Sequence, residues 1–89
     1  MGSRSLRDPR VFDEDERPWF EALGKAITGL REARDMSQTD LAAAADLEPQ
    51  WIGEIEAGAV AAPWGHLRRI ARAFGMELPD LIVAGEEQE

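Results

Sequence analysis

The stretch that decides the fold is residues 37–58, which read SQTDLAAAADLEPQWIGEIEAG. Ser37 carries a hydroxyl that can cap a helix, and Asp40, three residues later, resembles the second half of a weak capping box. The run of four alanines that follows favours helix and lets neighbouring helices approach closely. These residues predict a short helix that begins after Ser37 and continues to Ala45.

A sharp turn and a second short helix follow in the same stretch. Asp46 tolerates the left-handed conformation that such a turn needs, and Pro49 suits the first position of a helix. Because Gly58 is a typical helix stop, we expect this second helix near residues 48–57. Two short helices joined by such a turn form a helix-turn-helix unit, whose second helix can enter the major groove of DNA. The apolar face of this unit includes Leu41, Leu47, Ile52 and Ile55.

Apolar residues recur at steps of three and four on both sides of this unit, which is the spacing of one helical face. Before the unit they predict a helix over about 18–34, and after it a helix that begins at Pro63 and ends at Gly75. Leu78, Leu81 and Ile82 suggest a short fifth helix. The expected fold class is therefore all-α, with five helices and no strand.

The chain divides into three expected segments. Residues 1–17 resemble an irregular arm, because Pro9 and the lack of apolar periodicity argue against a helix. Residues 18–85 form the helical domain, and residues 86–89 form an acidic, solvated tail. The arm contains three arginines, Arg4, Arg7 and Arg10, ahead of an acidic run.

Composition excludes several classes of function. The 89 residues contain no cysteine, which rules out disulfides, thiolate metal sites and a cysteine nucleophile. His66 is the single histidine and the carboxylates are scattered, so we expect no enzyme, no metal and no cofactor. No apolar run approaches the roughly 18 residues of a membrane helix, and no signal peptide is visible. We therefore expect a cytoplasmic protein that does not bind membranes.

Residues 30–42, LREARDMSQTDLA, resemble the start of the Cro/C1-type (XRE family, lambda repressor-like) helix-turn-helix domain. The similarity covers roughly residues 23–83, and it continues through Ile52, Ile55-Glu56-Ala57-Gly58, Leu67, Ile70-Ala71 and Leu81. It implies a five-helix domain whose third helix reads the bases of double-stranded DNA. A protein of this kind would lie in the cytoplasm, associated with the nucleoid.

The resemblance also implies roles for individual residues. Gln38 would contact backbone phosphate and support the reading helix. The side chains implied to face the bases belong to Pro49, Gln50, Trp51 and Glu54. Arg31 and Glu56 would form a buried ion pair, which makes Glu56 a structural residue.

The charge is unusual for this family. Ten basic residues face 18 acidic ones, for a net charge of −8, whereas nucleic-acid binders usually carry a basic footprint. Residues 37–58 contain no base and five acids, which are Asp40, Asp46, Glu48, Glu54 and Glu56. Phosphate contacts would then come from backbone amides, from Gln38 and Thr39, or from arginines elsewhere. These arginines are Arg68, Arg69 and Arg72 together with those of the arm.

Several side chains have two interpretations. Gln50 either makes two hydrogen bonds to an adenine edge or is an exposed helix residue. Trp51 either contacts a thymine methyl group or a sugar, or covers the rim of the core. The arginines near 68–72 either contact phosphate or form a solvated face, and those of the arm either enter a minor groove or belong to a disordered tail. Trp19 and Trp64 are expected in the core and His66 on the surface.

Two functions follow. The first is a DNA-binding transcriptional regulator that acts as a homodimer, because one short helix reads too few bases for specificity. Spare apolar surface for a dimer is expected at Trp51, Val60, Val83 and the alanine-rich loop. The alternative is an acidic helix-turn-helix module that has lost DNA binding and binds a protein partner. Its contact patch would be Trp51 together with residues 59–62.

Overall fold

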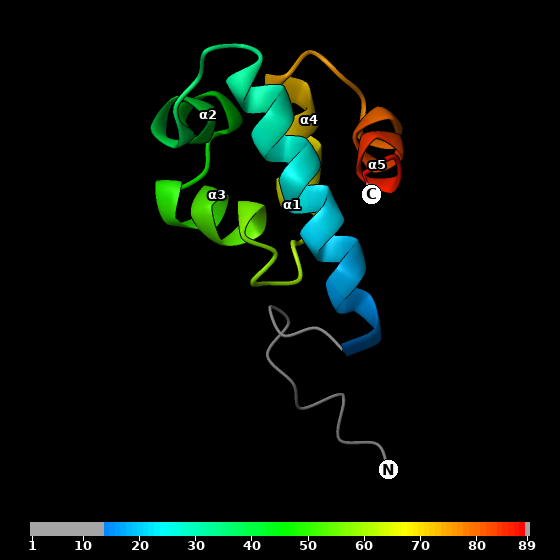
Figure 1. Ribbon diagram of the computed structural model, residues 1–89. Coiled ribbons are helices and arrows are strands. Elements are labelled where there is room, and N and C mark those ends of the chain that lie inside the picture. Colours follow the sequence, from blue (N-terminus) through cyan, green and yellow to red (C-terminus); the bar gives the residue numbers. More distant parts are fainter. Residues whose placement is uncertain (1–13, 89) are drawn as a thin grey trace.

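The computed structural model describes residues 14–88, in which five α-helices follow a short 3₁₀ helix (Figure 1). The elements are η2 (Glu14–Glu16), α1 (Arg17–Glu32), α2 (Gln38–Ala45), α3 (Pro49–Glu56), α4 (Trp64–Ala73) and α5 (Leu78–Glu86). This range contains no strand. The all-α, five-helix class predicted from the sequence is confirmed.

The helices of the helix-turn-helix segment begin and end where the caps and turns predicted from the sequence lie. The hydroxyl of Ser37 accepts a hydrogen bond from the backbone N–H of Asp40, and the carboxylate of Asp40 accepts one from the backbone N–H of Ser37. These hydrogen bonds hold the pKa of Asp40 below its usual range. Asp46 lies in the left-handed region with φ 58°, Pro49 is the first residue of α3, and Gly58 follows the helix with φ 69°.

Other helix ends differ from expectation by one or two residues. Residues 14–16 form η2 and Arg17 begins α1, so the last part of the expected irregular arm is helical. Carboxylates at that end are favoured by the positive pole of the α1 dipole. Residues 1–13, which include the arm arginines, lie outside the described residues. α1 ends at Glu32 rather than near residue 34, because Asp35 turns the chain with φ 56°.

At the other end of the chain, two further bounds shift by one residue. Pro63 precedes α4 as its N-cap instead of starting it, with extended backbone angles. α5 includes Glu86, which the sequence placed in the acidic tail.

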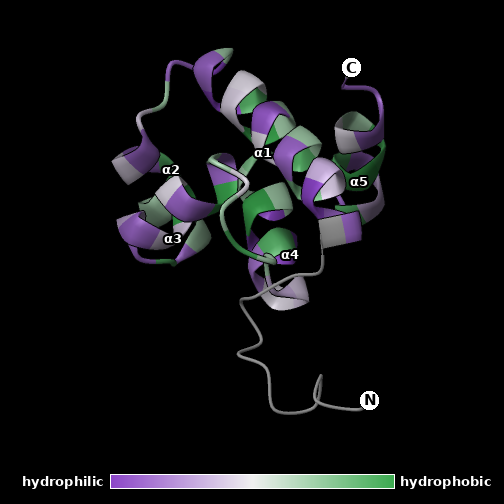
Figure 2. Cartoon of the chain, turned by 60° about the horizontal axis from the view of Figure 1, so that its bottom comes forward, coloured by the Kyte–Doolittle hydropathy of each residue, from purple (hydrophilic) through white to green (hydrophobic). Residues whose placement is uncertain are grey.

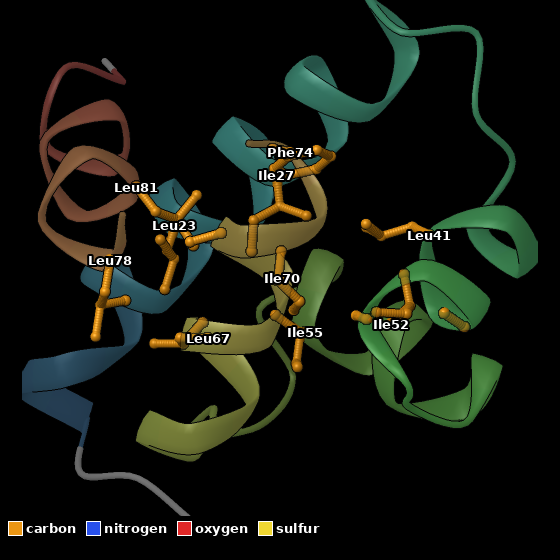
Figure 3. Packing of buried hydrophobic residues seen from close by; sticks show 13 residues of the cluster. Leu23, Ile27, Leu41, Ile52, Ile55, Leu67, Ile70, Phe74, Leu78 and Leu81 are labelled. Carbon is orange, nitrogen blue, oxygen red and sulfur yellow. The ribbon is translucent and has the colours of Figure 1, made fainter. Parts of the chain in front are cut away.

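Every α-helix contributes to one hydrophobic core (Figure 3). α1 lies along α5 on one side and contacts α3, while α2 packs against both α3 and α4. Among the described residues, no polar or charged residue is buried as a whole. The largest fully buried ones are Leu23, Ile27, Leu41, Ile52, Ile55, Leu67, Ile70 and Leu81. This shared core fixes the orientation of α3 relative to α2.

Besides this core, two close contacts join α1 and the loop after it to the rest of the domain. Gly24 lies so close to the end of α3 that a Cβ atom there would stand 2.4 Å from the carbonyl oxygen of Glu56. Just beyond the end of α1, Arg34 donates a hydrogen bond to the carbonyl of Phe74 and lies over its ring, 5.0 Å from the centroid. Through Gly24, α1 therefore packs directly against the end of α3.

Two aromatic residues differ from the sequence prediction. Trp64 was expected in the core, but its side chain is 66% exposed. It stands one turn before buried Leu67, and because it is the first residue of α4 the described helices do not cover it. His66 was expected on the surface, but it is half-buried and its ring packs against Trp51. Trp19 is half-buried and packs against the core, as expected.

None of the helices in residues 14–88 is both long and apolar enough to cross a lipid bilayer.

Candidate nucleic-acid interface

An ion pair joins α1 to the end of α3. Arg31 donates from Nε to Oε2 of Glu56 at 2.7 Å and from Nη2 to Oε1 at 3.1 Å, which is a bidentate geometry. Both side chains are largely buried, at 12% and 5% exposure. The hydrogen bond with Glu56 raises the pKa of Arg31. The structure thus contains the buried pair that the family resemblance implies.

The same carboxylate also holds the beginning of α2. Gln38 donates from Nε2 to Oε1 of Glu56 at 2.9 Å, and Arg31 donates from Nη1 to the carbonyl of Met36 at 2.8 Å. Glu56 therefore ties the end of α3 to α1 and to the first residue of α2, and Arg31 ties α1 to the loop before α2. The link between Gln38 and Glu56 was not predicted from the sequence, because only the fold brings residues 18 positions apart together.

The outer side of α3 carries the side chains implied to face the bases. Ile52 and Ile55 point into the core, whereas Pro49 and Gln50 are exposed and Glu54 is half-buried. Gln50 donates from Nε2 to Oε2 of Glu54 at 3.2 Å, across one helical turn. Figure 2 shows hydrophilic residues on the outer turns of α2 and α3. The structure therefore pairs exposed Gln50 with half-buried Glu54 on the outer side of α3.

Trp51 connects this face to α4. Its ring is half-buried and packs edge-on against His66, with the ring centroids 4.3 Å apart. Burial of His66 and the nearby charge of Arg69 lower the pKa of His66. Of the two interpretations of Trp51, this geometry favours the rim of the core. The contact between the rings of Trp51 and His66 was not predicted from the sequence.

A row of arginines on α4 lies beside the turn between α2 and α3. Arg68, Arg69 and Arg72 are all exposed and line a shallow hollow of about 300 Å³ together with Gly65. Arg69 donates to the carbonyl of Asp46 in that turn at 3.1 Å. Within residues 14–88, Arg68 and Arg72 make no hydrogen bond or ion pair. These guanidinium groups form a compact basic surface next to the beginning of α3.

The apolar patch expected for a protein partner is partly covered. Trp51 and Val60 pack against the core, and Ala61 and Ala62 are only half-exposed. The large apolar side chains that the structure exposes are those of Trp64 and Val83, at 66% and 50%. Trp51 and Val60 therefore offer less spare apolar surface than expected, because both are half-buried against the core, whereas Val83 is exposed as expected.

A family model described as a helix-turn-helix domain matches residues 22–82 of this sequence. The chain belongs to the helix-turn-helix domain family. The match covers α2, the turn and α3 as well as the three helices packed around them. Together with the five-helix fold, it confirms the Cro/C1-type resemblance seen in residues 30–42.

Solved structures of three other proteins share this fold. The clp gene regulator ClgR from Corynebacterium glutamicum is 25% identical, with a TM-score of 0.71 over 76% of this chain and 72% of ClgR. The restriction-modification controller protein C.AhdI from Aeromonas hydrophila is 26% identical, with a TM-score of 0.67 over 70% of this chain and 94% of C.AhdI. The competence regulator ComR from Streptococcus vestibularis is 25% identical, with a TM-score of 0.67 over 80% of this chain and 23% of ComR. No curated protein sequence matches the chain significantly.

Proposed function

We propose that this helix-turn-helix protein is a DNA-binding transcriptional regulator that inserts α3 into the major groove. The observation that carries the proposal is the bracing of α3. Glu56 at its end is bound by both Arg31 and Gln38, while Gln50 near its beginning is exposed. A rigid helix with one exposed polar face suits base recognition, because contacts to base edges require fixed geometry. The family match and the proteins named as regulators, ClgR and ComR, support the same function.

Phosphate contacts are proposed at the two sides of α3. On one side, Gln38 keeps a second amide hydrogen beyond the one donated to Glu56, and Thr39 is exposed beside it. On the other side, the arginine row of α4 adjoins the turn that leads into α3. Phosphate contacts of this kind set the orientation of the protein without reading sequence.

We further propose that the chain acts as a homodimer. One reading helix contacts few bases, so two copies on adjacent half-sites supply the specificity that one copy lacks. The exposed Trp64 and Val83 support a self-association surface, because large apolar side chains gain from burial. Sedimentation at micromolar concentration is expected to give twice the chain mass of 9.9 kDa. A particle of one chain, alone and on a duplex with two half-sites, would contradict this.

The experiment that tests the function is direct binding to duplex DNA. The full chain is titrated into a labelled pool of mixed duplexes at about 50 mM salt, where electrostatic contacts are strong. We expect a saturable complex that Gln50→Ala retains with weaker sequence preference. If no duplex is bound, the chain has kept the fold without its function, and the protein-interaction alternative takes its place.

A further inference from the structure

Two glycines inside the helices are required by the packing of the fold. A Cβ atom at Gly24 would stand 2.4 Å from the carbonyl oxygen of Glu56, and one at Gly85 would stand 3.1 Å from the side chain of Leu23. Both glycines are buried, and α1 packs against another helix at each of them. A side chain at either position would have to displace its neighbours.

Three other helical glycines have room for a side chain. Nothing lies within 4 Å of a Cβ atom built at Gly29 or Gly65, and at Gly53 the neighbour is Oε1 of Gln38, at 3.8 Å, which is ordinary contact. None of the three has a positive φ. Glycine inside a helix is less stable than alanine, because it loses more conformational freedom on folding. The fold by itself would therefore favour alanine at all three positions.

Two of these three glycines lie on the surface proposed to meet DNA. Gly53 stands on α3 one turn after exposed Gln50, and its neighbour outside the helix is Gln38, which is proposed to contact phosphate. Gly65 lines the hollow of about 300 Å³ that the arginine row of α4 borders. Gly29, by contrast, is exposed on α1, outside α2, α3 and the arginine row.

A missing side chain lets DNA come closer to the backbone of a helix. The major groove admits one helix, so the side chains on the inserted face limit how deeply that helix enters. At Gly65 the missing side chain leaves the hollow open, and the arginines around it suit the bidentate binding of phosphate. Close approach is important in this protein, because residues 37–58 contain no base that could attract the duplex.

We infer that Gly53 and Gly65 serve the contact with DNA rather than the fold. Gly53 lets the edges of the bases approach the backbone of α3, and Gly65 admits one backbone phosphate into the hollow among the arginines of α4. This inference rests on the proposed function. The two glycines meet different parts of the duplex, so Gly53 affects the choice of sequence and Gly65 affects affinity for every sequence.

The test measures stability and DNA binding on the same variants of the full chain. Gly53→Ala and Gly65→Ala are each expected to raise the melting temperature and to weaken binding on the order of 10-fold to the duplex that wild type enriches from a library. Gly65→Leu fills more of the hollow and is expected to weaken binding further. Gly29→Ala is the matched control, expected to raise the melting temperature at unchanged affinity.

Selection from the duplex library then separates the two roles. Gly53→Ala is expected to alter the base preferred at one or more positions of the enriched sequence. Gly65→Ala is expected to lower the affinity for all sequences by a similar factor while keeping their order, because a phosphate contact carries no sequence information.

Three results would overturn the inference while leaving DNA binding intact. The first is unchanged affinity in Gly53→Ala or Gly65→Ala, and the second is an equal loss of affinity in Gly29→Ala. The third is a lower melting temperature in Gly53→Ala or Gly65→Ala, because the fold itself would then require the glycine. If wild type enriches no duplex, the proposed function fails, and this inference fails with it.

Discussion

Replacing Arg31 with methionine is expected to lower the free energy of unfolding by about 3–5 kcal/mol. In the wild type the side chain of Glu56 is only 5% exposed, and the substitution removes the bidentate partner of its carboxylate. Gln38 remains as a neutral donor, which compensates a buried charge only in part. The carbonyl of Met36 loses a hydrogen bond in addition. Urea denaturation followed by circular dichroism measures the difference.

Two further variants separate the ion pair from general damage to α1. Glu32→Ala changes an exposed neighbour on the same helix and is expected to shift stability by no more than about 0.5 kcal/mol. The double variant Arg31→Met/Glu56→Leu removes both charges, so it is expected to be more stable than Arg31→Met alone. If Arg31→Met unfolds at the same urea concentration as wild type, the pair does not hold α3 in place.

Adding one methyl group at Gly24 is expected to destabilise the domain by about 3 kcal/mol, at the upper end of the cost of overpacking a core. The new Cβ atom would stand 2.4 Å from the carbonyl oxygen of Glu56 and 2.6 Å from that of Ile55. Both obstacles are backbone atoms at the end of α3, so relief requires the two helices to move apart. The close packing of α3 against α1 would then be lost.

Gly29→Ala provides the matched control on the same helix. Nothing lies within 4 Å of a Cβ atom built there, so the higher helix propensity of alanine is expected to add about 0.5–1 kcal/mol of stability. The two substitutions are chemically identical and are predicted to have opposite signs. Equal melting temperatures for both variants would show that α1 and α3 are not in close contact at Gly24.

The fold was largely predictable because its signals are local. Ser37, Asp46 and Gly58 set the ends of α2 and α3 through caps and left-handed turns, and these act over a few residues. The apolar spacing of α1 and α4 likewise gave their buried faces. Spacing does not say how far along a helix its neighbours extend, which is why Trp64 was assigned to the core although it lies beyond the covered part of α4.

The site was predictable only in part. The pair formed by Gln50 and Glu54 follows from a spacing of four on one helix, and this signal was present in the sequence. The contacts of Gln38 with Glu56 and of Trp51 with His66 join separate helices, so they depend on the packing of the whole domain. The roles in DNA binding came from family resemblance, and they stay predictions.

The measurement that tests the central claim most directly is a salt titration of DNA binding. The slope of log affinity against log salt is about 0.9 for each neutralised phosphate. Because residues 37–58 carry no side-chain cation, wild type is expected to show a slope shallow for its fold, with specific binding well above random binding. Glu54→Lys is expected to bind both duplexes more tightly and to steepen the slope by about 0.9. Tight binding of a random duplex by wild type with a steep slope would contradict the account, because cations outside α2 and α3 would then dominate the interface.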